Sequence, residues 1–252
     1  MQDRLTGKVI VVAGAGGIGD ELARRYCAEG ASVVLGDIDG ERARAVAADI
    51  GSGAIGTQLD GGDEASIKAA VDLAVGSFGG LDGFHANYAT FPAGERDTDL
   101  LGMPMEVWDE VMRVNSRGFL LCTRHALPHM IARGGGSMVY TSSGAAYQGE
   151  VVRLAYAMSK VSLHALMRHV ARAFGPQGIR ANVISPGVIA HGRFYELVPE
   201  DVVQGFYETT LFKNRLGEPR DIAAMGALLM ADEGSFITGQ VLNVDGGTLM
   251  RA

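Results

Sequence analysis

The sequence contains few of the residues that build disulfide frameworks or metal clusters. It has only two cysteines, Cys27 and Cys122, and they do not show metal-ligand spacing. Both fall in helical patterns, so we expect them to be small residues of the core or of an interface. His125 and His129 lie four residues apart on a predicted helix, but no third ligand accompanies them. The sequence therefore predicts no metal site.

Positive charge and long hydrophobic runs are also scarce. Lysine and arginine number 22 against 29 aspartates and glutamates, which gives a net charge of −7. No basic stripe is present to hold a nucleic-acid backbone. The first apolar run, from Val9 to Ala13, is far shorter than a membrane span or the core of a signal peptide. We therefore expect a cytoplasmic protein that binds neither nucleic acid nor a membrane.

Strand-like apolar runs alternate with helical patterns from the N-terminus onward. The 252 residues, 47% of them hydrophobic, suffice for one sizeable core, so we expect a single domain over residues 1–252. The alternation predicts an α/β fold, a Rossmann-type doubly wound parallel sheet of about seven strands flanked by helices. The predicted strands are Lys8–Ala13, Ser32–Asp37, Ala54–Leu59, Gly83–Asn87, Ser137–Ser142, Arg180–Ser185 and Gln240–Val244. The predicted helices are Ile18–Glu29, Glu41–Ile50, Asp63–Phe78, Pro104–Arg133, Leu154–Phe174 and Pro219–Ala231.

Two stretches, Tyr88–Met103 and His191–Leu216, show neither a strand nor a helix pattern. Long irregular segments inside a compact domain are usually lids or binding loops. We interpret residues 190–216 as a lid over a substrate site.

A glycine-rich turn, Gly14-Ala15-Gly16-Gly17-Ile18-Gly19, follows the first predicted strand and opens the first helix. In that context, backbone N–H groups and the positive end of the helix can hold the pyrophosphate of a dinucleotide. Asp37 ends the second strand, where a carboxylate accepts hydrogen bonds from both hydroxyls of the adenosine ribose. It would also repel a 2′-phosphate by about 1–4 kcal/mol. Since no Arg or Lys occupies the glycine turn, the sequence predicts NAD rather than NADP.

Tyr156 and Lys160 lie four residues apart on a predicted helix and therefore share one face. An ammonium beside a phenol lowers the phenol's pKa, and each unit is equivalent to about 1.36 kcal/mol, which suits a general acid or base. Ser143 lies thirteen residues earlier, at the end of a predicted buried strand, where open α/β sheets place their chemistry. Asn115 lies inside a long helical stretch, where an amide has poor helix propensity.

With these four residues the chain resembles the short-chain dehydrogenase/reductase family, which is defined by an Asn, Ser, Tyr and Lys tetrad. The likeness extends over about residues 5–247. It implies that Tyr156 is the acid/base and that Lys160 lowers its pKa and holds the nicotinamide ribose. It also implies that Ser143 steadies the substrate oxygen and that Asn115 holds a water linking Lys160 to solvent. The implied reaction interconverts an alcohol and a ketone, with hydride passing to or from the nicotinamide.

The resemblance also implies contacts with NAD (NADH). Asp60, followed by Gly61, matches the family's adenine-contacting Asp, and Pro186 to Ile189 resembles the turn that faces the nicotinamide. The predicted cofactor-binding residues are Gly14, Gly17, Ile18, Gly19, Asp37, Ile38, Asp60, Gly61, Asn87, Val114, Tyr156, Lys160, Pro186, Gly187 and Ile189.

The sequence departs from the family pattern at three places. The glycine turn is one residue shorter than T-G-x-x-x-G-x-G, and Ala13 replaces its Thr. Of the N-N-A-G segment only Asn87 is kept, with Tyr88 after it. His191 replaces the Thr expected to contact the carboxamide.

For the substrate, the mostly apolar and aromatic pocket residues predict a neutral, fairly bulky secondary alcohol or ketone. No clustered Arg or Lys is present there to receive a carboxylate, phosphate or coenzyme A. The predicted substrate residues are Ser143, Ala145, Gln148, Tyr156, His191 and Phe194.

Two alternatives remain open at the level of sequence. One is a 3-oxoacyl-type reductase of acyl-carrier substrates, which would prefer NADP and is disfavoured by Asp37. The other is a catalytically silent dinucleotide-binding sensor, which is disfavoured by the intact tetrad. The resemblance further implies a homotetramer built through the helices Pro104–Arg133 and Leu154–Phe174, with the C-terminal segment forming a second interface.

Four further polar residues are interpreted as structural. His85 lies in the apolar fourth strand and is predicted to be a satisfied core histidine. Arg96, Asp97 and Asp99 are predicted to be solvated charges of a loop.

Overall fold

The computed structural model describes residues 3–91, 96–192 and 194–250. These residues form a sheet of seven parallel strands in the order β3-β2-β1-β4-β5-β6-β7, which confirms the predicted Rossmann-type α/β fold. The strands are β1 (Val9–Ala13), β2 (Ser32–Asp37), β3 (Ala54–Gln58), β4 (Gly83–Ala86), β5 (Gly136–Thr141), β6 (Ile179–Pro186) and β7 (Val241–Val244). Every predicted strand is present within one residue of its predicted bounds.

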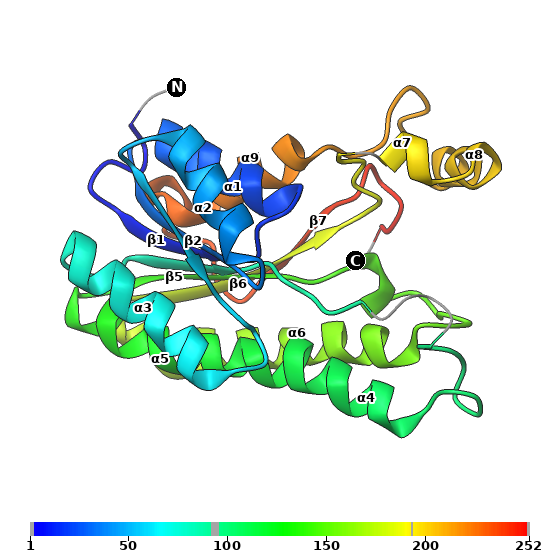
Figure 1. Ribbon diagram of the computed structural model, residues 1–252, viewed down its shortest axis with the longest axis horizontal. Helices are drawn as coiled ribbons and strands as arrows, with labels where there is room; N and C mark the ends of the chain where they lie inside the picture. Colours follow the sequence, from blue (N-terminus) through cyan, green and yellow to red (C-terminus); the bar gives the residue numbers. More distant parts are fainter. Residues whose placement is uncertain (1–2, 92–95, 193, 251–252) are drawn as a thin grey trace.

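Helices cover both faces of the sheet (Figure 1). On one face lie α1 (Ile18–Ala28), α2 (Gly40–Ile50) and α9 (Pro219–Met230); on the other lie α3 (Glu64–Phe78), α4 (Met105–Met112), α5 (Gly118–Ala132) and α6 (Leu154–Phe174). A strand covered on both faces has a continuous run of apolar residues in its sequence. All five residues of β1 are apolar and buried. This burial explains why the strands were recognisable from the sequence.

The strand order reverses between β1 and β4, which leaves a crevice at the carboxyl ends of the strands. Four short helical turns complete the described structure: η1 (Arg113–Arg117), η2 (Gly144–Ala146), η3 (Gly175–Gln177) and η4 (Asp232–Gly234). In the described part of the chain, no helix has the length and apolar character needed to cross a bilayer.

The predicted helix over residues 104–133 is interrupted. It consists of α4, the π-helical turn η1 and α5, one after another. A π-turn holds one residue more than an α-turn and is often found at functional sites. It has no clear sequence signature, which explains why one continuous helix was predicted.

The expectation of an irregular segment over residues 191–216 was wrong. This segment contains α7 (Phe194–Leu197) and α8 (Glu200–Thr209), which project beyond the end of the sheet in Figure 1. Val203, Phe206 and Tyr207 share one face of α8 and pack with Ala190 and Leu216. Residues 92–95 and 193 of the two predicted irregular segments lie outside the described residues.

Candidate active site

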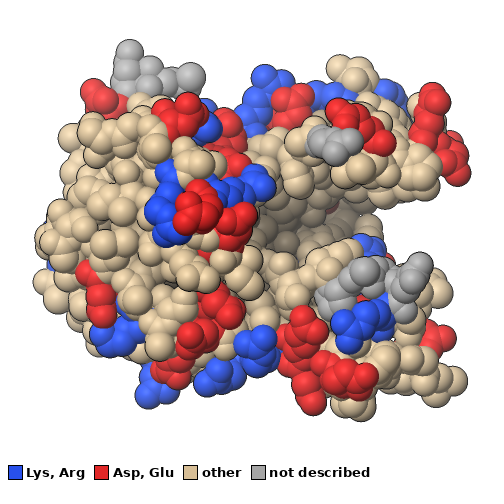
Figure 2. Space-filling view, viewed as in Figure 1, with Lys and Arg blue, Asp and Glu red and all other residues tan. Residues whose placement is uncertain are grey.

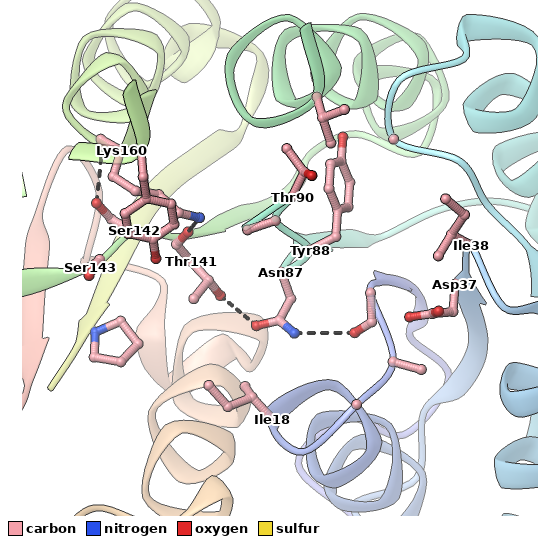
Figure 3. A pocket seen from close by; sticks show the side chains of 18 of the residues that line it. Ile18, Asp37, Ile38, Asn87, Tyr88, Thr90, Thr141, Ser142, Ser143 and Lys160 are labelled. Carbon is pink, nitrogen blue, oxygen red and sulfur yellow. Dashed lines mark hydrogen bonds between the residues drawn. The ribbon is translucent and has the colours of Figure 1, made fainter. Parts of the chain in front are cut away.

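A cavity of about 660 Å³ opens at the carboxyl ends of the strands. Thirteen of the fifteen predicted cofactor residues line it: Gly14, Ile18, Asp37, Ile38, Asp60, Gly61, Asn87, Val114, Tyr156, Lys160, Pro186, Gly187 and Ile189. Figure 3 shows them converging from the glycine turn, from the ends of the strands and from the helical layer. Gly17 and Gly19, the remaining two, are not among the residues that line it. The topology therefore gathers residues that are far apart in the sequence around one space.

The glycine turn is shaped by close backbone approaches. A Cβ on Gly14 would lie 2.6 Å from the Tyr88 amide nitrogen, and one on Gly19 would lie 1.8 Å from the Gly14 carbonyl oxygen. Gly14 also has a φ of 100°, which side chains rarely adopt. The missing side chain of Gly19 thus allows α1 to start directly on the turn, and its contact with the cofactor stays a prediction. The bare backbone left at the turn is the cradle that a pyrophosphate needs.

Asp20, which the sequence analysis missed, closes the turn. Its carboxylate accepts a hydrogen bond from the Gly16 amide at 2.9 Å and pairs with Arg42 of α2 at 2.8 Å. The hydrogen bond to Asp20 and the nearby charges of Asp37 and Asp39 raise the pKa of Arg42. A guanidinium therefore stands beside the glycine turn although no basic residue occurs within it. The signal available in the sequence was an acidic residue in the first turn of a helix.

Lys160 lines the cavity described above and is almost completely buried. Its side chain is only 1% exposed, and its Nζ donates to the Thr141 carbonyl at 2.9 Å. The Nζ lies 5.6 Å from the centroid of the Tyr156 ring. Burial lowers the pKa of Lys160 to about 7. The lysine therefore exchanges its proton near neutral pH, with both its charged and its neutral form populated when only protein surrounds it.

Tyr156 has the opposite shift. Burial raises the pKa of its phenol above the usual value, a hydrogen bond with Ser143 and the charge of Arg153 lower it, and Glu150 raises it. The phenol thus keeps its proton at neutral pH in this environment. The lowering of this pKa by Lys160 stays a prediction, because burial and the neighbours of Tyr156 other than Lys160 account for its shift.

Ser143 and its neighbour Ser142 have different partners. The Ser142 hydroxyl is buried, donates to the Lys160 carbonyl at 3.1 Å and lies 3.0 Å from His164. The Ser143 hydroxyl accepts from the Ala145 amide at 3.2 Å at the start of η2 and lines the cavity beside Tyr156. Ser143 also lines the second cavity, and its contact with a substrate oxygen stays a prediction.

Asn115 is fully buried within the π-turn η1. Its Oδ1 accepts from the Thr90 amide at 2.7 Å, and its Nδ2 donates to the Thr90 carbonyl at 3.0 Å and to Ser159 Oγ at 3.4 Å. The Asn115 side chain thereby pairs with both backbone groups of Thr90, in the segment that follows β4. Its implied water-holding role stays a prediction.

A chain of hydrogen bonds leads from the glycine turn into the core, and Figure 3 shows its first part, through Asn87 and Thr141. Asn87 Nδ2 donates to the Gly14 carbonyl at 3.2 Å, so its Oδ1 is free to accept from the Thr141 hydroxyl at 2.9 Å. Thr141 must then accept from His85 Nε2 at 3.0 Å, which leaves His85 Nδ1 to accept from the Tyr26 hydroxyl at 2.8 Å. Burial lowers the pKa of His85 to about 3 and keeps it neutral. His85 is a satisfied core histidine, as predicted.

A second cavity, of about 670 Å³, meets the first at Ser143, Pro186 and Gly187. Ala145 and Gln148 line it, together with residues of α8 and of the C-terminal segment. Figure 2 shows a deep hollow on this side whose visible walls carry few charged atoms. Four of the five charged side chains in its lining form two ion pairs, Glu150 with Arg153 and Asp221 with Arg215. The fifth, Asp245, accepts hydrogen bonds from the backbone amides of Gly247 and Leu249. A bulky neutral molecule fits this environment better than a charged one.

Two predicted substrate residues lie elsewhere. His191 lines the first cavity and packs over Gly17, where a Cβ would lie 2.4 Å from its Cγ, so it belongs to the cofactor side. Phe194 packs against Phe206, with ring centroids 6.3 Å apart, in the cluster beneath α8. The sequence located both in the lid but could not say which way either side chain points.

The prediction for Asp97 was wrong. Arg96 and Asp99 are exposed as predicted, but Asp97 is only 1% exposed and accepts hydrogen bonds at the start of α6. A contact between residues almost sixty positions apart leaves no local pattern, which explains the error.

Other residues named from the sequence take structural positions. Cys122 is buried and Cys27 half-buried, and His125 lies 3.1 Å from Glu64. Within the ranges that the structure describes, no three His, Cys, Asp or Glu residues gather closely enough to hold a metal ion.

Comparison with known proteins gives a consistent result. A family model described as enoyl-(acyl carrier protein) reductase matches residues 12–248. A Mycobacterium tuberculosis protein named "uncharacterized oxidoreductase" is 40% identical over 249 residues, 97% of this chain and 98% of its own length. A Bradyrhizobium diazoefficiens protein named "probable short-chain type dehydrogenase/reductase" is 38% identical over 98% of this chain and 89% of its own length. A Mycobacterium bovis protein named "3-alpha-(or 20-beta)-hydroxysteroid dehydrogenase" is 36% identical over 99% of this chain and 92% of its own.

Proposed function

Because this chain belongs to the short-chain dehydrogenase/reductase family and is an oxidoreductase acting on CH–OH groups, we propose that it interconverts a neutral, bulky secondary alcohol and its ketone with NAD. The observation that carries the proposal is the meeting of the two cavities at Ser143, beside Tyr156. The first cavity has the glycine cradle and the acidic strand end of a dinucleotide site. The second has room for a molecule of a different kind.

In the oxidative direction, Tyr156 as phenolate takes the proton of the alcohol hydroxyl. The Ser143 hydroxyl donates a hydrogen bond to the same oxygen and fixes its position. Lys160 stays bound to the Thr141 carbonyl and adds positive charge beside the phenolate when protonated. A bound nicotinamide supplies the acceptor for the hydride that leaves the carbinol carbon. In reduction the same groups act in reverse, and Tyr156 returns its proton to the ketone oxygen.

The choice of NAD over NADP rests on Asp37. Its carboxylate lines the cavity at the end of β2 and accepts from the Asp39 amide at 2.9 Å. Arg42, the basic group near the glycine turn, is paired with Asp20. A 2′-phosphate would therefore face a carboxylate without a free guanidinium to compensate, at a cost of about 1–4 kcal/mol.

The class of substrate rests on the second cavity. Four of its five charged side chains form ion pairs, the fifth, Asp245, accepts from backbone amides, and its other walls are uncharged. One relative carries the name of a hydroxysteroid dehydrogenase. The proposal also includes a homotetramer in the cytoplasm. Leu120 of α5 and Met158 and Val161 of α6 are each nearly half exposed, which suits an interface through these two helices.

The first prediction is turnover by purified protein offered NAD or NADP with a panel of neutral alicyclic, aromatic and steroid-like secondary alcohols. We expect NADH to form with at least one alcohol and NADP to support less than about a tenth of that rate. The variant Tyr156→Phe should bind NADH normally and turn over at least about 100-fold more slowly, because the proton acceptor is missing.

The same assay distinguishes the alternatives. If the protein instead prefers to reduce a 3-oxoacyl carrier substrate with NADPH, it is a 3-oxoacyl-type reductase and the proposal is wrong. Tight NADH binding without turnover, unchanged by Tyr156→Phe, would identify a sensor.

A further inference from the structure

The helix that carries Tyr156 and Lys160 starts without a capping side chain of its own. The residue before α6 is Arg153, which has a φ of 66° and makes no side-chain cap. The first N–H groups of a helix have no partner within the helix, and Ser, Thr, Asp or Asn usually supplies one. Arginine has no acceptor to offer. The start of α6 therefore needs an acceptor from elsewhere in the chain.

Asp97 supplies it from the segment that follows β4. One carboxylate oxygen accepts from the Ala155 amide at 3.0 Å, and the other accepts from the Tyr156 amide at 2.9 Å. The Asp97 carbonyl accepts from the Arg153 amide at 2.7 Å. Both oxygens of a buried carboxylate are thus used on successive amides, one of which belongs to Tyr156 itself.

Two more contacts join this segment to the tetrad. Thr90 is held by the Asn115 amide through both its N–H and its carbonyl. The Phe91 ring meets the Tyr156 ring edge-on, with centroids 5.0 Å apart. Phe91 therefore contacts the ring of Tyr156, and Asp97 binds its backbone amide.

We propose that Asp97 is a positioning residue for Tyr156: its carboxylate sets where the catalytic helix starts and offsets the positive end of that helix beside the phenol. The inference rests on the proposed function, since it concerns the proton that Tyr156 carries. It goes beyond the tetrad because Asp97 touches neither cavity and acts only through the backbone of α6.

The charge of Asp97 belongs to a small group around Tyr156. Lys160 and Arg153 are the nearby cations, Glu150 and Asp97 are the nearby carboxylates, and Ser143 binds the phenol. The N-terminus of α6 adds a positive partial charge. Removing the negative charge of Asp97 leaves that positive end uncompensated, which favours the phenolate.

The test is the variant Asp97→Asn in the full chain, assayed with an alcohol that the wild-type enzyme oxidises. Asparagine keeps the shape but has one acceptor where the carboxylate has two, so one of the two amides loses its partner. The matched control is Asp99→Asn, because the Asp99 residue is exposed and its carboxylate accepts from the Leu101 and Gly102 amides of its own turn. Rates are divided by the concentration of NADH-binding sites, so unfolded protein does not count.

We expect kcat of Asp97→Asn to fall about 10-fold or more through misplacement of Tyr156. The Kd for NADH should change less than about 2-fold, because Asp97 does not line the nucleotide cavity. The acidic limb of the pH–kcat profile should move to lower pH by about half a unit. Asp99→Asn should match the wild type in all three. Wild-type turnover in the same assay tests the proposed function separately.

The proposal is overturned if Asp97→Asn has the kcat and pH profile of Asp99→Asn and differs only in melting temperature. Asp97→Ser, which keeps one acceptor without charge, is the second variant and should show the same shift of the acidic limb. Failure of both variants to bind NADH would also overturn it, because Asp97 would then be needed for folding rather than for placing Tyr156.

Discussion

At the scale of single residues, burial dominates the chemistry of Lys160. The sequence alone suggests a cation that acts on Tyr156, whereas desolvation in the structure brings the pKa of the lysine to about 7. Tyr156 is shifted upward by the same cause. Near pH 7 the protein by itself therefore keeps Tyr156 neutral and Lys160 divided between its charged and neutral forms, and a negatively charged or polar neighbour at Lys160 would favour the charged form.

The burial of Lys160 makes stability depend on pH. Between pH 7 and about 10.4 the unfolded chain binds a proton at this lysine and the folded chain does not, so the free energy of unfolding rises with pH over that window. We expect the stability of the wild type relative to Lys160→Met to increase by about 1–2 kcal/mol from pH 7 to pH 9, measured by urea unfolding.

The control for this measurement is Lys68→Met. Lys68 lies on the surface of α3, with 57% of its side chain exposed. Its contribution should stay constant over the same pH range. Equal pH dependence in the two variants would contradict the buried, neutral state of Lys160.

Sequence reasoning could predict the tetrad because its clues are local. The i,i+4 spacing of Tyr156 and Lys160, and the place of Ser143 at the end of a strand, are set by the period of one element. Asp97 and the pair Asp20–Arg42 were missed, since their partners lie on other elements and no short pattern links them.

At the scale of elements, the start of α5 fixes one wall of the nucleotide cavity. Gly118 begins α5, and a Cβ there would lie 2.1 Å from the Gly61 carbonyl oxygen and 2.6 Å from the Tyr88 hydroxyl. The helix can therefore approach the turn after β3 only because this residue has no side chain. Tyr88 packs beside Phe119, with ring centroids 4.8 Å apart, and lines the nucleotide cavity but not the second one.

A methyl group at Gly118 should disturb this contact. We expect Gly118→Ala to destabilise the fold by about 1–3 kcal/mol through overpacking and to weaken NADH binding, because Gly61 lines the cavity. Thermal unfolding and NADH fluorescence titration measure the two effects.

Gly76→Ala is the matched control for Gly118→Ala. Gly76 lies inside α3, and nothing lies within 4 Å of the position of a Cβ there. Alanine should stabilise this helix by up to about 1 kcal/mol and leave NADH binding unchanged. A loss of NADH affinity in this variant, or none in Gly118→Ala, would refute the account of the α5 contact.

The elements also mark where sequence prediction ends. The strands were predicted to within one residue because burial on both faces gives each a continuous apolar run. The π-turn η1 and the helix α8 were not predicted. The π-turn differs from an α-helix by a single additional residue in one turn. Helix α8 has only a few apolar positions, which pack in a small cluster of their own.

At the scale of the whole molecule, the parallel sheet brings two cavities to one edge. The loops after β1 to β6 supply the nucleotide side, while α8 and the C-terminal segment supply the walls of the other side. The sequence predicted the first in detail, because it is made by turns at strand ends. It predicted the second only as apolar and bulky, because its walls come from three distant segments.

The most direct test of the central claim is the fate of the carbinol hydrogen. The protein is offered NAD and an accepted secondary alcohol carrying deuterium at the carbinol carbon, and the NADH formed is analysed by mass spectrometry. We predict NADH one mass unit heavier, with an unlabelled ketone, and labelled NADH formed at least about 100-fold more slowly by Tyr156→Phe. Deuterium released into water, or labelled NADH formed equally well by Tyr156→Phe, would contradict hydride transfer governed by Tyr156.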